Sequence, residues 1–120
     1  MPEESFGFTL RELRRAAKLT QRELANRIGV DFSYISKIEN QRLPPPSADT
    51  IVEICRALEV KPEELLALTG KIPTNVHRTL SGSRVAQEFL SEIHEMDLTD
   101  EEWKIMVKSL QELRRHNRDE

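Results

Sequence analysis

The side chains that most often carry catalysis or bind metals are few in this chain and lie far apart. Its histidines, His77, His94 and His116, do not have the spacing of ligands to one metal ion. The single cysteine, Cys55, excludes an internal disulfide and occupies an apolar helical position, where it is best explained as a small core residue. Neither a glycine-rich phosphate loop nor a nucleophile motif is present. We therefore expect no enzyme, no metal site and no cofactor.

Charged side chains, in contrast, are distributed unevenly along the chain, whose net charge is −3. Between Thr9 and Arg42 there are eight basic residues against four acidic ones, whereas from Leu43 to Gly70 there are two against five. A basic end and an acidic end can orient a domain on a polyanion such as DNA. Because solvated helix faces would produce the same pattern, the charges alone leave both explanations open.

The elements that carry these side chains are predicted to be helices. Only 5% of the residues are aromatic, and runs of alternating apolar and polar residues are lacking, so a sandwich, a barrel or a βαβ protein is not expected. Leu10, Leu13 and Ala17 recur at helical spacing, which indicates a first helix from about Thr9 to Lys18. The sequence therefore predicts an all-α fold.

Capping signals delimit two short helices after this one. Thr20 can cap a second helix, and Glu23 completes the pattern of a capping box. This helix should end at Gly29, which takes the left-handed conformation without steric cost. Asp31 or Ser33 can then cap a third helix. Two short helices joined by a glycine turn form a helix-turn-helix arrangement, here at about residues 20–39.

Apolar spacing also predicts which helix faces are buried. Two further helices are expected, one capped by Ser47 and one with Pro62 in its first turn. The predicted inward residues of the second to fifth helices are Leu24, Ala25, Ile28, Ile35, Ile38, Ile51, Ile54, Cys55, Leu58, Leu65, Leu66 and Leu68. The outer side of the third helix is left with Phe32, Ser33, Tyr34, Ser36 and Lys37.

The residues of the two motif helices resemble a known family. The run LRRAAKLTQRELANRIGV from Leu13, followed by SYISKIEN from Ser33, is similar to the lambda-repressor-like, or Xre-type, regulators, and the resemblance covers about residues 8–70. It implies a five-helix DNA-binding domain in which the third helix enters the major groove of double-stranded DNA and the second braces it across the backbone.

The resemblance also implies which side chains meet the DNA. Gln21 would contact a phosphate at the start of the second helix. Lys37 would favour a guanine edge and Phe32 a thymine methyl group, unless that ring covers the core. The full set of expected DNA-binding residues is Gln21, Arg22, Phe32, Ser33, Tyr34, Ser36, Lys37, Asn40 and Arg42.

One position departs from the family. After Glu39 and Asn40 the family usually has a glycine in the left-handed conformation, whereas this chain has Gln41, for which that conformation costs roughly 1 kcal/mol. Either the cap shifts to Asn40 or the loop differs. The prolines at 44–46 should keep the following stretch stiff and extended, and the backbone contacts expected of Asn40 and Arg42 depend on this loop.

The remaining residues lie outside the resemblance. Residues 71–83 are predicted to be a linker with one helical turn at 76–80, and residues 84–120 a hairpin of two amphipathic helices, the second with a capping box at Thr99 and Glu102. Their apolar stripes cannot bury each other fully, so a partner surface is implied. The expected dimerisation residues are Phe89, Ile93, Trp103, Met106, Val107 and Leu110, with Phe89 and Trp103 as anchors.

These features predict a DNA-binding domain at residues 1–70, a linker at 71–83 and a dimerising hairpin at 84–120. The expected function is that of a transcriptional repressor that binds a palindromic operator as a homodimer. With no signal peptide and no membrane span expected, the predicted location is the cytoplasm. An alternative is a protein-interaction module of the antitoxin or anti-repressor type, whose C-terminal helices bind a partner protein or are cut by a regulatory protease. Packing of these helices on the first domain is also left open.

Overall fold

The computed structural model describes residues 5–119. All the regular secondary structure in this range is helical. Residues 1–4 and 120, which the predicted domains also include, lie outside the described residues. The chain divides into two compact units, Met1–Arg78 and Thr79–Glu120. No helix in the described part of the chain is long and apolar enough to cross a membrane.

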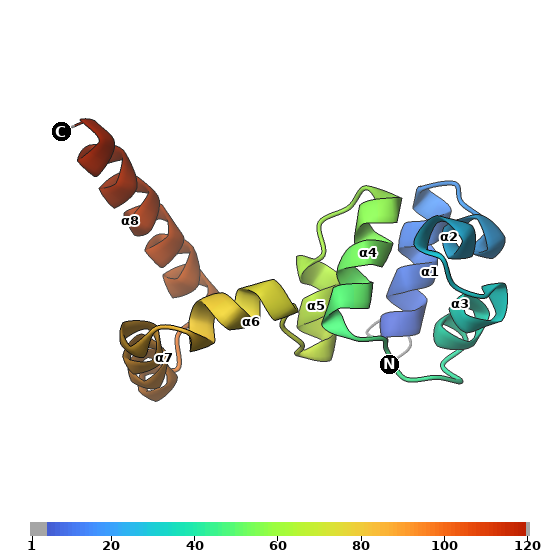
Figure 1. Cartoon of the computed structure of the whole chain (residues 1–120), viewed down its shortest axis with the longest axis horizontal. Coiled ribbons are helices and arrows are strands. Elements are labelled where there is room, and N and C mark those ends of the chain that lie inside the picture. The colour runs from blue at the N-terminus through green and yellow to red at the C-terminus, as the bar shows by residue number, and fades with distance from the viewer. Residues whose placement is uncertain (1–4, 120) are drawn as a thin grey trace. The chain divides into compact units, whose positions relative to one another are not determined.

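The first unit contains the five predicted helices (Figure 1). They are α1 (Phe6–Ala16), α2 (Gln21–Ile28), α3 (Phe32–Glu39), α4 (Ala48–Leu58) and α5 (Glu63–Thr69). Helix α1 begins three residues earlier than the spacing of its apolar residues predicted. The cause is Ser5, whose hydroxyl oxygen accepts a hydrogen bond from the backbone N–H of Phe8 at 3.1 Å and so caps the helix.

The caps around the motif are as predicted. Thr20 and Glu23 form a reciprocal capping box, with both hydrogen bonds at 3.0 Å. Gly29 ends α2 in the left-handed conformation at φ 74°. Of the two candidates, Asp31 caps α3, because its carboxylate accepts a hydrogen bond from the Ser33 N–H at 2.9 Å. The turn between the two helices is therefore fixed by side chains of the motif itself.

The core lies where helices α1 to α5 meet. Residues predicted to point inward on each of these helices, among them Leu10, Leu24, Ile35, Ile51 and Leu65, have no exposed surface. Leu68 was wrongly predicted to be buried.

The side chain of Leu68 is 41% exposed. Helix α5 packs on α1 and α4 and joins the core through Leu65 and Leu66, whereas Leu68 in its last turn lies outside the core cluster.

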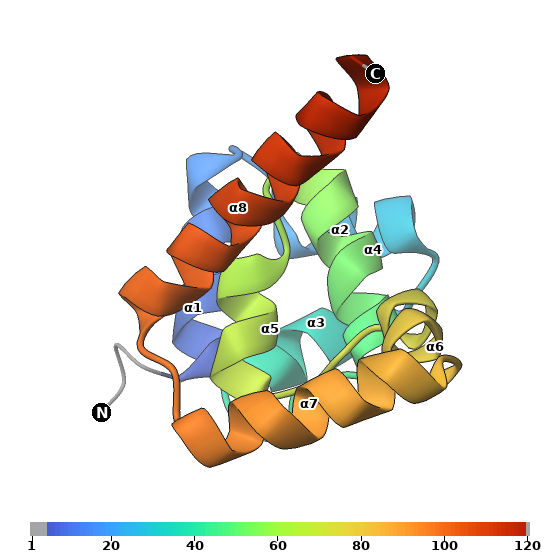
Figure 2. The same cartoon turned by 90° about the vertical axis from the view of Figure 1, so that its left-hand side faces the viewer.

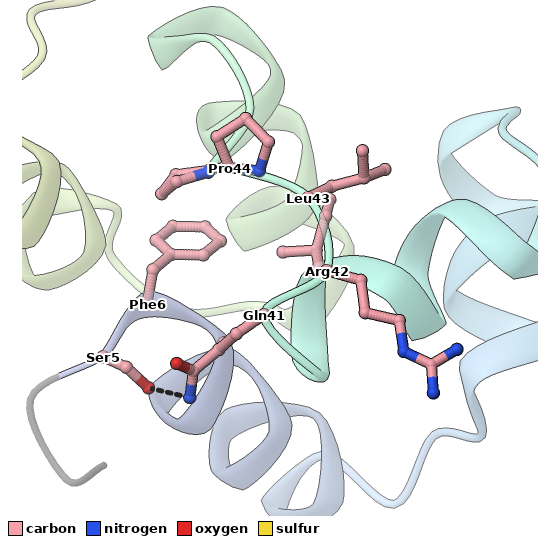
Figure 3. A pocket seen from close by; sticks show the side chains of 9 residues that line it. Ser5, Phe6, Gln41, Arg42, Leu43 and Pro44 are labelled. Atoms are coloured by element: carbon pink, nitrogen blue, oxygen red, sulfur yellow. Dashed lines mark hydrogen bonds between the residues drawn. The ribbon is translucent and has the colours of Figure 1, made fainter. Parts of the chain in front are cut away.

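The loop after α3 shows whether Asn40 or Gln41 takes the left-handed conformation that ends this helix. Asn40 stays outside the left-handed region at φ −91°, and Gln41 takes the left-handed conformation at φ 61°. Its side-chain N–H donates to the hydroxyl of Ser5 at 3.3 Å (Figure 3). The cap therefore does not shift: Gln41 occupies the position where the family usually has glycine, and its side chain links the loop to the start of α1.

Helix α6 (Thr74–Ser81) occupies the segment predicted to be a linker and is longer than the single turn expected there. Its first residue, Thr74, donates hydrogen bonds from its backbone N–H and its hydroxyl to the two carboxylate oxygens of Asp49, at 2.9 and 2.6 Å. The ammonium group of Lys71 donates to the carbonyl of Pro46 at 2.9 Å. These contacts attach the start of the segment to the first unit.

The second unit contains α7 (Arg84–Met96) and α8 (Asp100–Asp119). Ser83 caps α7, and Thr99 and Glu102 form the predicted capping box of α8, with hydrogen bonds at 3.0 and 3.2 Å. A turn with Asp97 at φ 49° separates the two helices, which leave it in different directions (Figure 2). None of the described side chains of α7 and α8 is buried, so the apolar residues of this unit remain accessible.

Candidate nucleic-acid interface

The outer face of α3 presents the side chains that the sequence placed there. Ile35 and Ile38 are buried beneath it, whereas Phe32, Ser33 and Lys37 are exposed. Tyr34 and Ser36 are half-buried at its edges. This face combines a cation, hydroxyl groups and an aromatic ring, which are the groups that contact base edges and thymine methyl groups in a major groove.

A buried carboxylate fixes α3 to the other motif elements. The side chain of Glu39 has no exposed surface. Its Oε2 accepts a hydrogen bond from Nε of Arg14 at 2.6 Å, and its Oε1 accepts one from Nη2 of Arg14 at 2.9 Å. Arg11 lies at 3.4 Å from Oε1. Arg14 also donates to the Leu19 carbonyl at 2.9 Å. The end of α3 is therefore bound to α1 by a bidentate ion pair.

The electrostatics of this pair favour the charged forms. Burial by itself raises the pKa of Glu39, but hydrogen bonds from Arg14, Gln21 and Arg11 together with the charge of Arg14 outweigh it, and the net pKa lies below the usual 4.5. The hydrogen bond with Glu39 in turn raises the pKa of Arg14. Both groups are thus ionised at neutral pH, and each compensates the other's buried charge.

This network of Glu39, Arg14 and Arg11 was not predicted from the sequence, where the three residues entered only as charges. Glu39 follows the buried Ile35 by four residues, and Arg14 follows the buried Leu10 by four. Residues four apart share a face of a helix, so both charges stand on inward faces. This spacing was a signal that each charge is buried and needs an opposite charge, although it does not say which residue supplies it.

The predicted phosphate ligand, Gln21, is part of the same network. Its amide nitrogen donates to Oε1 of Glu39 at 3.0 Å, and the side chain is half-buried at the start of α2. Glu39 therefore sets the direction of this side chain. The phosphate contact of Gln21 remains a prediction.

Arg22 and Phe32 meet across the motif. The guanidinium carbon of Arg22 lies 4.5 Å from the centre of the Phe32 ring, within the range of a cation–π contact. Phe32 is 37% exposed and outside the core cluster. The ring thus supports Arg22 and keeps an accessible edge.

An open hollow beside this pair adds cations that the sequence analysis did not assign to the site. Its lining includes Arg15 and Lys18 from the end of α1, together with Thr20, Arg22 and Phe32. The exposed Arg15 and Lys18 flank the start of α2. The basic surface therefore extends from α3 across the beginning of α2 to α1.

Asn40 and Arg42 lie at the other end of α3. The side-chain oxygen of Asn40 accepts a hydrogen bond from Arg11 at 2.6 Å, and the backbone N–H of Arg42 donates to the Lys37 carbonyl at 2.8 Å. In Figure 3 the Arg42 side chain points away from Phe6 and Pro44, which line a surface hollow at the start of α1. Asn40 and Arg42 are both exposed, and their roles toward DNA remain predictions.

The predicted dimerisation residues all belong to the second unit. Phe89, Trp103, Val107 and Leu110 are exposed, and Ile93 and Met106 are half-buried. They form no core of their own. Among the described residues no group of histidine, cysteine or acidic side chains is arranged to hold a metal ion.

Comparison with known proteins gives consistent matches to regulators. A family model described as a helix-turn-helix domain matches residues 5–68. The uncharacterized HTH-type transcriptional regulator RghRB of Bacillus subtilis is 46% identical over 67 residues, which are 56% of this chain and 48% of that protein, so the chain spans about half the length of this relative. The HTH-type transcriptional repressor RghR of Bacillus subtilis is 33% identical over 111 residues, which are 88% of this chain and 82% of that protein.

A solved structure of a SinR protein–SinI protein complex aligns with 92% of this chain and 98% of that one, with 21% identity and a TM-score of 0.49. The family match covers more than half of the chain, and it falls on the five helices and the buried network described above. The chain belongs to the helix-turn-helix transcriptional regulators and carries the helix-turn-helix DNA-binding domain of that family.

Proposed function

We propose that the chain is a transcriptional repressor of the cytoplasm that binds a two-fold symmetric operator as a homodimer. The observation that carries this proposal is the exposed face of α3, which the buried Glu39 network holds rigidly beside the cations Arg15, Lys18 and Arg22. In the proposed complex Ser33, Ser36 and Lys37 read bases in one major groove, and Gln21 and Arg42 contact phosphates on either side.

The second unit supports the homodimer. Its exposed apolar side chains need a cover. A second copy of the chain would provide this cover, and a two-fold homodimer would match the symmetry of an operator with two half-sites. The name of RghR, a repressor similar to this chain over most of both units, supports repression as the direction of regulation. A bound dimer would repress by occupying the promoter.

The test is a selection of bound sequences from a random duplex pool with the full chain, followed by affinity measurements on the enriched site. We expect a two-fold symmetric sequence. The variant Lys37→Ala should lose about 1 to 3 kcal/mol of specific binding free energy if Lys37 contacts a base. Lys61→Ala is the matched control, because Lys61 is exposed beside α5 at the acidic end and should leave binding unchanged. A pool that shows no enrichment even at low salt would contradict the proposal.

A second candidate rests on the same exposed apolar faces, which fit a different partner protein as well as a second copy. In that case α7 and α8 bind an antagonist or target protein, and DNA binding is secondary. The discriminating pair is Trp103→Ala and the double variant Ser36→Ala with Lys37→Ala. If the double variant keeps every activity and Trp103→Ala abolishes it, the interaction module is the better description.

A further inference from the structure

Helix α8 carries a continuous apolar stripe along one face. Trp103, Met106, Leu110 and Leu113 follow one another at intervals of three, four and three residues, the spacing of the seam in a coiled coil. Their exposed fractions are 41% for Trp103, 58% for Leu110 and 56% for Leu113. With 20 residues the helix is about 30 Å long. The stripe from Trp103 to Leu113 takes up about 15 Å of that length, as a narrow seam that a second helix can cover.

The two ends of α8 carry opposite charges. Its first turn contains Asp100, Glu101 and Glu102, whereas Arg114, Arg115 and Arg118 occupy its last turns. All six side chains are exposed. Lys104 near the first end and Glu112 and Asp119 near the last end reduce this contrast, but the first end stays net acidic and the last end net basic. Two such helices therefore attract each other more when they run in opposite directions than when they run in parallel.

We propose that α8 pairs with α8 of a second copy in an antiparallel coiled coil whose two-fold axis crosses the interface at the level of residue 108. This inference deepens the proposed homodimer and rests on it. In this register Trp103 packs against the partner copy's Leu113, and Met106 packs against the partner copy's Leu110. Every apolar residue of the seam therefore meets an apolar residue.

The same register pairs opposite charges beside the seam. Arg114 directly follows Leu113 of the seam, and Asp100 stands 14 residues, two heptads, before Arg114. Both therefore occupy the same position beside the seam, and antiparallel pairing brings such positions of two helices together. Two equivalent Asp100–Arg114 contacts then flank the interface. Lys108 lies about 160° around the helix from the seam residues Met106 and Leu110. The two copies of Lys108 therefore do not face each other across the interface. The two-fold axis also supplies the symmetry that a palindromic operator requires.

Cysteine cross-linking of the full chain tests the direction of pairing. A mixture of Trp103→Cys and Leu113→Cys chains should form mixed dimers with a short thiol-reactive linker, and Leu113→Cys alone should not, because its two copies lie about 15 Å apart along the axis. The unmodified chain is the control. Its Cys55 is buried and burial raises the thiol pKa to about 11, so it reacts poorly. Efficient cross-linking of Leu113→Cys with itself would show parallel pairing and overturn the proposal.

Charge reversal tests the register. Arg114→Glu should raise the dimer dissociation constant roughly five- to tenfold, because two attractive contacts become repulsive. Adding Asp100→Lys to the same chain should restore it. Arg115→Glu is the matched control, since it makes the same charge change one residue later on the outer face and should have little effect. Equal effects of Arg114→Glu and Arg115→Glu, or no rescue by Asp100→Lys, would exclude this register.

The measurements distinguish failure of the antiparallel α8 pairing from failure of the proposed homodimer. A chain that is monomeric in sedimentation at micromolar concentration contradicts the homodimer itself and points to packing of α8 on the first unit or on another protein. A chain that forms dimers and binds a symmetric site, but fails the cross-linking and rescue tests, keeps the proposed function and loses only the antiparallel α8 pairing.

Discussion

At the scale of single residues, the decisive side chain is Glu39, which accepts hydrogen bonds from Arg14, Arg11 and Gln21 without any exposed surface. A buried ion pair contributes little compared with an apolar pair, but removing one partner leaves the other charge uncompensated. The same carboxylate orients Gln21 at the start of α2. The stability of the first unit and the geometry of its DNA-binding face therefore both depend on the carboxylate of Glu39.

We predict that Glu39→Gln lowers the free energy of unfolding by about 3 to 5 kcal/mol, because it leaves the Arg14 guanidinium without a counter-charge. Urea denaturation followed by circular dichroism measures this loss. The matched control is Glu53→Gln, which removes the partner of Arg56 in an exposed ion pair of 2.6 Å on α4 and should cost less than about 1 kcal/mol. Similar losses for the two variants would contradict the role given to Glu39.

The pH dependence of stability follows from the same group. Because the folded chain holds the pKa of Glu39 below 4.5, the unfolded chain binds its proton first as the pH falls. The contribution of Glu39 is therefore complete above about pH 4.5 and is lost as the pH falls through its lower folded pKa. We expect the stability difference between the wild type and Glu39→Gln to shrink below pH 4.5 in denaturation series at several pH values. A difference that stays constant down to pH 2 would contradict this assignment.

At the level of the helices, α1 approaches the end of α3 closely at Gly7. A Cβ added to Gly7 would lie 2.5 Å from the Ile38 carbonyl oxygen and 2.8 Å from that of Glu39. Both are backbone atoms, which cannot move aside without shifting a helix. Gly7 thus allows the approach of the two helices that the Glu39–Arg14 pair requires.

Gly7→Ala should therefore destabilise the fold by about 1 to 3 kcal/mol or more, the range of overpacked cores. Gly29→Ala is a useful comparison, because Gly29 has φ 74° but open space around its Cβ direction. Gly29→Ala should lower the free energy of unfolding only by the cost of placing alanine in the left-handed conformation, about 1 to 2 kcal/mol. Thermal unfolding measures both. We also expect weaker DNA binding per folded molecule for Gly7→Ala only, since this variant displaces α3.

At the scale of the whole molecule, the net charge of −3 conceals a basic surface on one side of the first unit. Binding to DNA depends on the local cations, because each phosphate contact releases counterions whatever the total charge of the protein. The acidic residues after position 43 then help to orient the domain, since they are repelled by the same phosphates.

Arg15→Ala is predicted to weaken binding to all sequences alike and to reduce the slope of log affinity against log salt concentration by about 1. The reason is that Arg15 lines the hollow at the start of α2 without belonging to the α3 face. Titrations at several salt concentrations, with operator and with unrelated duplex, provide the measurement. An unchanged slope would place Arg15 outside the interface.

The five helices of the first unit, most of their caps and nearly all of their inward residues could be predicted from the sequence. These features depend on residues three or four apart, as in the capping box of Thr20 and Glu23 or the sequence of buried Ile51, Ile54 and Leu58. Local spacing also placed Phe32, Ser33 and Lys37 on the outer face of α3. Such signals can be read without knowing the tertiary structure.

The features that join distant segments could not be predicted from the sequence. Glu39 and Arg14 are 25 residues apart in the chain, and no local pattern says that their helices meet. The close approach at Gly7, the left-handed Gln41 held against Ser5 and the attachment of α6 through Asp49 arise in the same way. The physical reason is that burial and long-range hydrogen bonds depend on which helices are neighbours, and this is fixed only when the whole core packs.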